Sequence, residues 1–537
     1  MTIIEATGPA AGRPHQATSA AGTGPATDSV APDSVAPDSA AGAESPGLAA
    51  DAVAAAGSRA ADPPAPESAA AGATAGNSAT AGSTTATLPY TVPQPPAVID
   101  AAIWPGIATV PSGLKAAVAG RVAEAIFKAA VRRLPLQVRY PDGSVLGRHA
   151  SAKGTAAGPA AAEPAATHPV MTINRPEAFV ARLGDGGLIG LGESYMAGDW
   201  DAEDLTAVLE VFAGSVSSLV PEPLQKLRAL YLPRQPRRER NTEQNTRSNI
   251  SRHYDLSNEL FATFLDETMT YSSALFPESG DALRQMGWDG LADAQQAKID
   301  RLLDKAGVTR GSRVLEIGTG WGELALRAAR RGATVYSVTL SSEQQELARQ
   351  RVAEAGYADA VTIELKDYRA VEGEYDAVVS VEMIEAVGFE YWATYFQTIE
   401  RVLAPGGKVA IQAITIGHDR LIATRTSYTW VHKYIFPGGV IPSVRAIEEI
   451  TEKQTGLRVR ERLAMGEHYA QTLRLWEERF MDRAAEVHGL GFDEIFQRMW
   501  LFYLCYSRAG FETGYLDVQQ IVLDSRRAGE SGGGSVS

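Results

Sequence analysis

The sequence has a single cysteine in 537 residues, which excludes a disulfide within the chain and fits a reducing compartment. Cys505 lies in an aromatic helical pattern at 500–506, where packing in a core is the expected role. The start lacks a charged segment followed by an apolar core, so we expect no signal peptide. Uncharged apolar runs of about 18 residues are also lacking, which argues against a membrane span. These absences predict a cytoplasmic protein.

Basic residues are in deficit, since 50 Lys and Arg face 64 Asp and Glu and give a net charge of −14. This balance argues against a nucleic-acid-binding protein. Two basic clusters nevertheless stand out, at 115–133 and 226–240. The first also carries Val118, Val122 and Ile126 at helical spacing. A basic amphipathic helix can lie on an anionic membrane surface, and an ordinary solvated helix face is the alternative.

Aromatic residues are almost absent from the first 95 residues, which are mostly Ala, Gly, Ser, Pro and Thr. Such a composition cannot bury enough apolar surface to offset chain entropy, so we expect 1–95 to be disordered. A short tail at 529–537 and an Ala/Gly/Pro-rich loop at 151–167 are expected to lack regular structure as well. Folded parts are then predicted at 96–240 and 241–528.

A strand, a glycine-rich turn and a helix are predicted near the middle of the chain. The apolar stretch 313–317 is typical of a strand buried on both faces, and 324–331 has helical spacing. The glycines between them allow positive φ and a close approach of the backbone to a ligand; they are Gly318, Gly320 and Gly322. The G-x-G-x-G spacing lacks the last glycine of the dinucleotide fingerprint, so NAD is a poor fit. Glu316 at the strand end favours a ligand with a positive charge.

Further strands of the same type follow. They are predicted at 334–339 and 375–381, with a helix that opens at 340–344. At 402–411 the sequence indicates a helix end, a Pro-Gly-Gly turn and a fourth strand. This order resembles the class I S-adenosylmethionine (SAM) methyltransferases, and it implies an α/β, Rossmann-like domain with SAM as cofactor.

Five separated motifs carry a narrower resemblance. They lie at 252–258, 264–276, 380–388, 434–439 and 468–473. In this order they resemble the cyclopropane-fatty-acyl-phospholipid synthase family. The resemblance implies a SAM-dependent methyltransferase that adds a methyl or methylene carbon to the double bond of an unsaturated acyl chain in a membrane phospholipid. It also implies peripheral association with the inner face of the membrane.

The part before the catalytic domain is predicted to be a small α+β unit. A hairpin is indicated at 138–145, a strand at 170–174 and a helix at 175–183. The segment 187–200 resembles the family's N-terminal domain, and its glycines and tryptophan are interpreted as turn and core. A helix is predicted over 201–212. By resemblance this unit helps to hold lipid or a second subunit, so a homodimer is an implied partner.

The resemblance also implies which residues hold the cofactor. The glycines would approach SAM with their backbone, Thr339 and Gln344 would hold the ribose and neighbouring groups, and Tyr368 would pack near the adenine. Tyr271 and Ser272 would close over the bound cofactor. The complete predicted set is Tyr271, Ser272, Glu316, Gly318, Gly320, Gly322, Thr339, Leu340, Gln344 and Tyr368.

Methylation of an unactivated alkene leaves a carbocation on the acyl chain, which must be kept from water and lose a proton. Aromatic faces stabilise such a cation in a dry pocket. Candidates within the family-like motifs are Tyr254, Tyr271, Tyr428, Trp430, Tyr434, Phe436 and Tyr469. The alternative for each of them is a role in the hydrophobic core.

In the family a bound bicarbonate acts as the base, and the resemblance places its cage at Ser273, Glu385, Gln412, Ile414 and Tyr469. We expect a raised pKa for Glu385, because a buried carboxylate beside an anion is favoured in its protonated form. Serine replaces the usual cysteine at 273, and glutamine replaces the usual histidine at 412. Either side chain can hydrogen-bond an anion, but neither supplies a cation or thiolate, which puts bicarbonate in question.

Two neighbours also depart from the family pattern. Glu382 stands where glycine is usual, and Ala386 stands where histidine is common. Glu382 could bind the SAM amino group, act as a base itself, or be a structural salt-bridge partner. The predicted catalytic set is therefore Glu385, Tyr469, Gln412, Ser273 and Glu382, and no metal is expected.

One cation can give two products. Proton loss from the added methyl closes a cyclopropane, whereas a hydride shift before proton loss leaves a methylene branch that a partner reductase would convert to a methyl branch. The Ala-rich composition and the altered base site fit the methylene branch, and both products stay open. A small-molecule methyltransferase and an inactive lipid- or SAM-binding module are the alternative functions.

Overall fold

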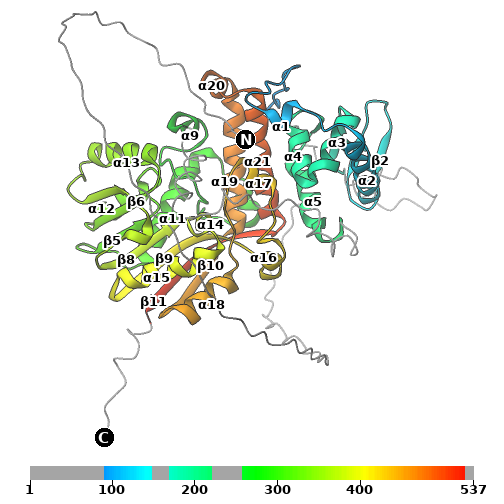
Figure 1. Ribbon diagram of the computed structural model, residues 1–537. Helices are drawn as coiled ribbons and strands as arrows, with labels where there is room; N and C mark the ends of the chain where they lie inside the picture. Colours follow the sequence, from blue (N-terminus) through cyan, green and yellow to red (C-terminus); the bar gives the residue numbers. More distant parts are fainter. Residues whose placement is uncertain (1–89, 148–167, 220–256, 526–537) are drawn as a thin grey trace, which may run out of the picture. The chain divides into compact units, whose positions relative to one another are not determined.

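The protein was analysed as a computed structural model that describes residues 90–147, 168–219 and 257–525 (Figure 1). Most of the predicted disordered tail lies outside these ranges. So do the loop at 151–167, the basic cluster at 226–240, Tyr254 and the tail at 529–537. Residues 90–95 are an exception, and for them the prediction of disorder is wrong: the Tyr90 hydroxyl donates to Glu477, and the Pro93 carbonyl accepts from Arg498.

A seven-stranded sheet in the order β10-β11-β9-β8-β5-β6-β7 forms the C-terminal part (Figure 1). The strands are β5 Arg313–Ile317, β6 Thr334–Thr339, β7 Val361–Leu365, β8 Tyr375–Val381, β9 Leu403–Ile416, β10 Leu457–Ala464 and β11 Leu516–Ser525. The five strands β9-β8-β5-β6-β7 pair in parallel with their neighbours in the sheet, and β11 is antiparallel to both β9 and β10. The predicted strands at 313–317, 334–339 and 375–381 are confirmed, whereas β7, β10 and β11 were not predicted.

Helices cover both faces of this sheet. They are α11 Leu291–Lys305, α12 Glu323–Arg330, α13 Ser342–Glu354, α14 Ile384–Val387, α15 Trp392–Val402 and α18 Val444–Gln454. Adjacent residues of β5 reach opposite cores: Val314 packs with α11, α12 and α13, and Leu315 packs with α15 and α18. The strand is therefore buried on both faces, as its apolar run predicts.

The Pro-Gly-Gly segment is a bulge within β9 rather than a turn before it. Leu403 of β9 pairs with Tyr375, and the next pair along is Lys408 with Ala377. Residues 404–407 of β9 thus lie opposite the single residue Asp376 of β8, and they include Gly406 at φ +80°. A glycine accommodates this conformation without a Cβ clash, which explains the sequence signal.

The N-terminal part forms a four-stranded sheet in the order β2-β1-β3-β4. Its strands are β1 Gln137–Arg139, β2 Val145–Gly147, β3 Val170–Ile173 and β4 Trp200–Ala202, and its helices include α2 Leu114–Val131, α3 Pro176–Gly186, α4 Leu188–Met196 and α5 Leu205–Leu219. The hairpin is confirmed by antiparallel pairing of Val138 with Leu146. The segment 187–200 is largely helical instead of a turn, but its tryptophan is fully buried as predicted.

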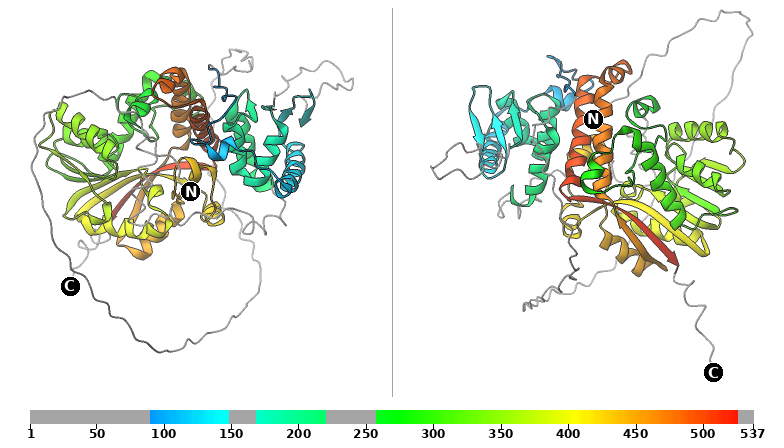
Figure 2. Two further views of the ribbon diagram at one scale, coloured as in Figure 1. Left: turned by 45° about the horizontal axis from the view of Figure 1, so that its top comes forward. Right: turned by 180° about the vertical axis from the view of Figure 1, so that it is seen from behind.

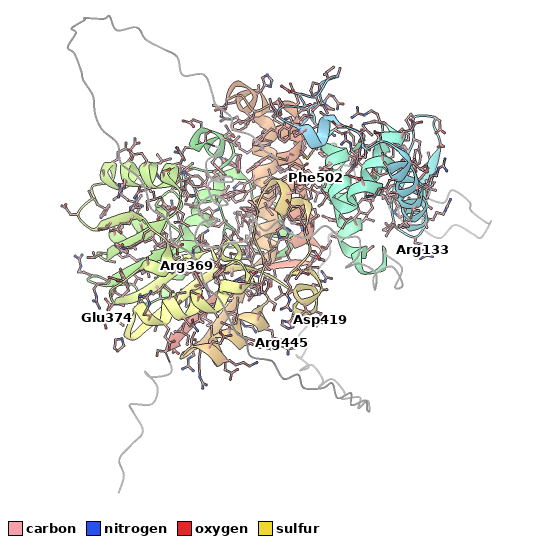
Figure 3. All side chains as sticks on the ribbon, viewed as in Figure 1. Arg133, Arg369, Glu374, Asp419, Arg445 and Phe502 are labelled. Carbon is pink, nitrogen blue, oxygen red and sulfur yellow. The ribbon has the colours of Figure 1, made fainter. Side chains whose placement is uncertain are left out.

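Two long helices, α19 Gly466–Asp482 and α21 Glu494–Glu512, run side by side (Figure 2). Phe502 on α21, labelled in Figure 3, contacts Tyr195 of α4 and Trp430, with ring centroids 5.4 and 4.7 Å apart. Arg498 is fully buried and donates to the Tyr195 carbonyl at 2.8 Å and to Asp201 at 2.7 Å. The two predicted folded parts therefore share one hydrophobic core. Cys505 lies in that core, as expected.

Candidate active site

The turn from β5 into α12 has the conformation that its glycines predict. Gly318, Gly320 and Gly322 have φ of +95°, +52° and +90°. A Cβ at Gly318 would lie 2.4 Å from Cγ of Met383, whereas a Cβ at Gly320 would meet nothing within 4 Å. Gly318 is therefore required by close packing as well as by its φ, and Gly320 leaves open space above the turn.

A cavity opens at this turn, beyond the carboxyl ends of the parallel strands, where ligands of open α/β sheets bind. Nine of the ten residues predicted to bind the cofactor line it: Tyr271, Ser272, Glu316, Gly318, Gly320, Thr339, Leu340, Gln344 and Tyr368. Gly322 is not on the cavity wall, because it packs against Ala348 of α13. The side chain of Thr339 donates to Gln344 at 3.1 Å, which fixes the glutamine on the cavity wall.

Two polar groups on the cavity wall suit a cofactor. The Tyr368 hydroxyl is buried and has no hydrogen-bond partner within the described part of the chain. Glu316 accepts from Ser337 at 2.6 Å, and burial raises the pKa of Glu316 to about 8. A cation bound in the cavity would offset that burial and favour the carboxylate. With the open backbone at Gly320, these features fit SAM.

Lys298 of α11 lines the cavity but was not predicted from the sequence as a site residue. It is fully buried, and its Nζ donates to the Ser272 hydroxyl at 2.6 Å and to the Ser273 carbonyl at 3.0 Å. Burial lowers its pKa to about 8, and the charge of Glu382 opposes that shift. One signal could have revealed it, since Lys298 lies at helical spacing from Ala294 and Leu302 on the buried face.

The side chain of Glu382, which follows β8, accepts three hydrogen bonds. Its Oε1 accepts from the backbone N–H of Ser273 at 3.0 Å and from Nε2 of Gln412 at 2.9 Å, and its Oε2 accepts from the Tyr469 hydroxyl at 3.0 Å. Four of the five predicted catalytic residues thus meet in one cluster, and Glu382 is the member that lines the cavity. Burial raises its pKa, while Lys298 and the three donors favour the carboxylate.

Glu385, the fifth, is held on the neighbouring α14. Its Oε1 accepts from the backbone N–H of Ile414, and its buried Oε2 has no partner among the described residues. Its pKa is raised to about 8, first by burial and then by the negative charge of Glu382, which confirms the expected direction. The two glutamates therefore differ in what compensates their burial, since Glu382 faces a cation and three donors, whereas the donor to the Glu385 side chain is a backbone N–H.

Aromatic side chains surround this cluster. Tyr271 stacks on Trp476 with ring centroids 5.2 Å apart, and its hydroxyl lies 2.8 Å from that of Tyr503. Tyr469 packs on Trp476 and Phe511 at 6.1 and 4.6 Å. The core interpretation holds for the candidates further away: Trp430 and Tyr434 pack toward the N-terminal part, with the Tyr434 hydroxyl 2.8 Å from Glu193, and Tyr428 stacks on His432.

Among the residues that the structure describes, no group of histidine, cysteine and acidic side chains is arranged to hold a metal ion. Within the same residues, no helix has the length and apolar character needed to cross a membrane.

Residues 241–521 match the mycolic acid cyclopropane synthetase family. The chain belongs to this family. It is 53% identical to the tuberculostearic acid methyltransferase UfaA1 of Mycobacterium tuberculosis, over 81% of this chain and 98% of that protein. It is 34% identical to the cyclopropane-fatty-acyl-phospholipid synthase of Escherichia coli K12, over 65% of this chain and 86% of that protein.

Solved structures of family members are also similar. The cyclopropane synthase MmaA2 from Mycobacterium tuberculosis is 30% identical, with a TM-score of 0.47 over 52% of this chain and 97% of that one. CmaA1 complexed with SAH and CTAB is 29% identical, with a TM-score of 0.47 over 54% of this chain and 98% of that one. The family match and the two relatives confirm the predicted family, fold class, cofactor and enzyme class. The chain is a SAM-dependent methyltransferase, and its reaction is methyl or methylene transfer to unsaturated acyl chains.

Proposed function

We propose that this methyltransferase acts on an unsaturated acyl chain of a membrane phospholipid and forms a mid-chain methylene branch. The observation that carries the choice of product is the 53% identity to a relative named as a methyltransferase, with no cyclopropane in its name, over 98% of that relative's length. The cyclopropane product is the second candidate, because a phospholipid cyclopropane synthase is 34% identical over 86% of its own length. A partner reductase would convert the methylene to a methyl branch.

The proposed chemistry assigns separate tasks to the cavity residues. Bound SAM supplies an electrophilic methyl group. The glycine turn and the Tyr368 hydroxyl would hold the cofactor, and the Glu316 carboxylate would compensate its positive charge. Tyr271 and Tyr469 present rings that exclude water and stabilise the cation on the acyl chain. The cluster at Glu382 receives the proton that leaves the cation.

Analysis of the lipid product tests this proposal. Purified protein is incubated with SAM and oleoyl-phospholipid vesicles, and acyl chains are analysed by mass spectrometry before and after mild hydrogenation. We expect a gain of one CH₂ and then uptake of hydrogen, because a methylene branch is reduced under conditions that leave a cyclopropane intact. A product that resists hydrogenation would replace the methylene assignment by cyclopropane. SAM binding without turnover on any unsaturated lipid would favour the binding-module alternative.

We further propose that α2 is the membrane-contacting element. Its residues Leu114, Val118 and Val122 are 84%, 54% and 56% exposed and follow one another at intervals of four, so they form a single apolar stripe. The opposite face is buried through Phe127 and Val131. The predicted apolar positions therefore do not all serve the core.

Basic side chains border this stripe. Lys115 and Arg121 are exposed beside it, and Arg132 and the labelled Arg133 follow the end of the helix (Figure 3). Lys128 is instead paired with Glu124 at 2.7 Å. Exposed apolar residues flanked by cations complement an anionic lipid surface, where each nearby charge contributes on the order of 1 kcal/mol.

Replacement of Val118 and Val122 by aspartate is expected to reduce sedimentation with anionic vesicles and methylation on them by at least about tenfold, since both apolar burial and charge attraction are lost. Methylation of a monomeric short-chain phospholipid should be unchanged. Leu490→Asp is the matched control, because Leu490 is 41% exposed at the end of another helix. Equal wild-type rates on neutral vesicles at high salt would contradict this surface assignment.

A further inference from the structure

Four of the five residues predicted to cage a bicarbonate already donate to carboxylates or carbonyls of the chain itself, and the fifth, Glu385, is an acid with one carboxyl oxygen that has no partner among the described residues. The Tyr469 hydroxyl and the Ser273 backbone N–H each have one proton to donate, and both protons go to Glu382. The Ile414 backbone N–H donates to Glu385. The Ser273 hydroxyl, at the usual cysteine position, donates to the Ala274 carbonyl at 3.0 Å.

Gln412 is committed in the same way, and a relay of side chains fixes its orientation. Arg301 donates to Oε1 of Gln520 at 2.6 Å, so Nε2 of Gln520 donates to Oε1 of Gln412 at 3.1 Å. Because Oε1 of Gln412 accepts from Gln520, its Nε2 lies on the opposite side, and the two N–H groups donate to Glu382 at 2.9 Å and to the Ser273 carbonyl at 3.2 Å. No N–H of Gln412 is left for an external anion.

These contacts do not fit a bound bicarbonate. We propose that Glu382 fills the anion site itself, so that its carboxylate, and not bicarbonate, is the base that deprotonates the carbocation. This inference rests on the proposed function for the reaction, but the occupancy of the anion site can be tested without it.

The surroundings of Glu382 suit this task. Lys298 is the buried cation on one side, and Glu385, with its raised pKa, is the neighbouring acid on the other. Glu382 also has φ +51°, a left-handed conformation that costs a non-glycine residue on the order of 1 kcal/mol. Strain of this kind persists where the surrounding contacts hold it and is concentrated at functional sites.

The proposed step is balanced. A C–H bond of the cation breaks, and its electron pair forms the third ring bond of a cyclopropane or the C=C bond of a methylene branch. The proton goes to a carboxylate oxygen of Glu382, which becomes neutral. No oxidant, reductant or further reactant takes part.

Two variants at this position separate the roles of charge and volume. Glu382→Gly removes the carboxylate, introduces the residue that suits φ +51° and frees the donors of Ser273, Gln412 and Tyr469. Glu382→Gln keeps the site filled but supplies no base. Glu390→Gly, an exposed position on the same stretch, is the surface control. SAM affinity and thermal unfolding report whether each variant is folded.

Bicarbonate binding is followed by line broadening of ¹³C-labelled bicarbonate in NMR, and turnover is measured in CO₂-free buffer with and without added bicarbonate. We expect no binding to the wild type and a rate that changes less than about twofold on bicarbonate depletion. Both variants should lose at least about 100-fold in rate. Glu382→Gly alone should bind bicarbonate and regain activity with it.

Bicarbonate binding to the wild type, or loss of its activity on depletion, would overturn the proposal. So would near-normal turnover of Glu382→Gln. If the wild type methylated no lipid at all, the proposed function would fail, and the binding measurements on the wild type and Glu382→Gln would still decide whether Glu382 fills the anion site. If Glu382→Gly does not fold, the same two proteins carry the decision.

Discussion

Glu385→Gln is expected to make the protein more stable at alkaline pH while it loses repeated turnover. The pKa of Glu385 is raised from 4.5 to about 8 by burial and by the charge of Glu382. Between these values the folded state holds a proton that the unfolded state lacks, so the free energy of unfolding falls as pH rises through that window. One pKa unit corresponds to about 1.4 kcal/mol, so the loss at pH 9 is on the order of a few kcal/mol.

Glutamine cannot ionise, and its amide can still accept from the Ile414 N–H. The variant and the wild type should therefore unfold alike near pH 5, and the variant should melt several degrees higher at pH 9. Glu316 has a similarly raised pKa and remains, so part of the alkaline destabilisation persists. Glu390→Gln, at an exposed position nearby, is the control and should follow the wild type.

The expected loss of turnover follows from the same protonation chemistry. We propose that Glu385, which holds a proton below its raised pKa, first releases that proton to solvent and then takes up the proton held by Glu382; its Oε2 is buried without a hydrogen-bond partner in the described chain. Rapid-mixing measurements should show a first turnover followed by slow cycles for Glu385→Gln, and no first turnover for Glu382→Gln. An unchanged steady-state rate of Glu385→Gln would remove Glu385 from the proton path.

The cofactor side of the site could be predicted because its signals are local. A short apolar run, glycines at alternate positions and a helical pattern stand together in the sequence, and the structure turns them into β5, the turn and α12. The two strands at one end of the sheet, β10 and β11, lacked such signals. Charged residues interrupt the apolar ones along strand β10, and strand β11 has two buried glutamines, Gln519 and Gln520, at its centre. Neither strand therefore has the long apolar run that is typical of a buried strand.

The anion side of the site could be predicted only in part, because its contacts join residues far apart in the chain. The sequence left three roles open for Glu382, and the role of a base that we propose is supported by hydrogen bonds from three separate segments. Which groups compensate a buried charge depends on packing between elements, and no spacing rule connects Lys298 on α11 with a residue at the end of β8. Such pairs become visible only in three dimensions.

Lys298→Met is expected to cost on the order of 1–3 kcal/mol in stability at pH 7, because it removes a buried cation whose charge favours the Glu382 carboxylate and leaves this half-buried carboxylate with less charge compensation. It also removes the hydrogen bond to the Ser272 hydroxyl and one of the two to the Ser273 carbonyl, which keeps the one from Gln412. Lys305→Met is the matched control on the same helix. Its partner Glu461 is 41% exposed, so this surface pair should contribute less than about 1 kcal/mol.

A double-mutant cycle separates the charge pair from simple loss of packing. Glu382→Gln in the Lys298→Met background removes the uncompensated charge, so the double variant should unfold at a higher denaturant concentration than Lys298→Met alone. The cycle is measured at pH 7, below the lowered pKa of Lys298, where the ammonium is charged in the wild type. If the two substitutions are simply additive, the lysine stabilises the site through its hydrogen bonds to Ser272 and Ser273 rather than through the charge of Glu382. A coupling of at least about 1 kcal/mol would instead identify Lys298 as the internal cation that keeps the proposed base ionised.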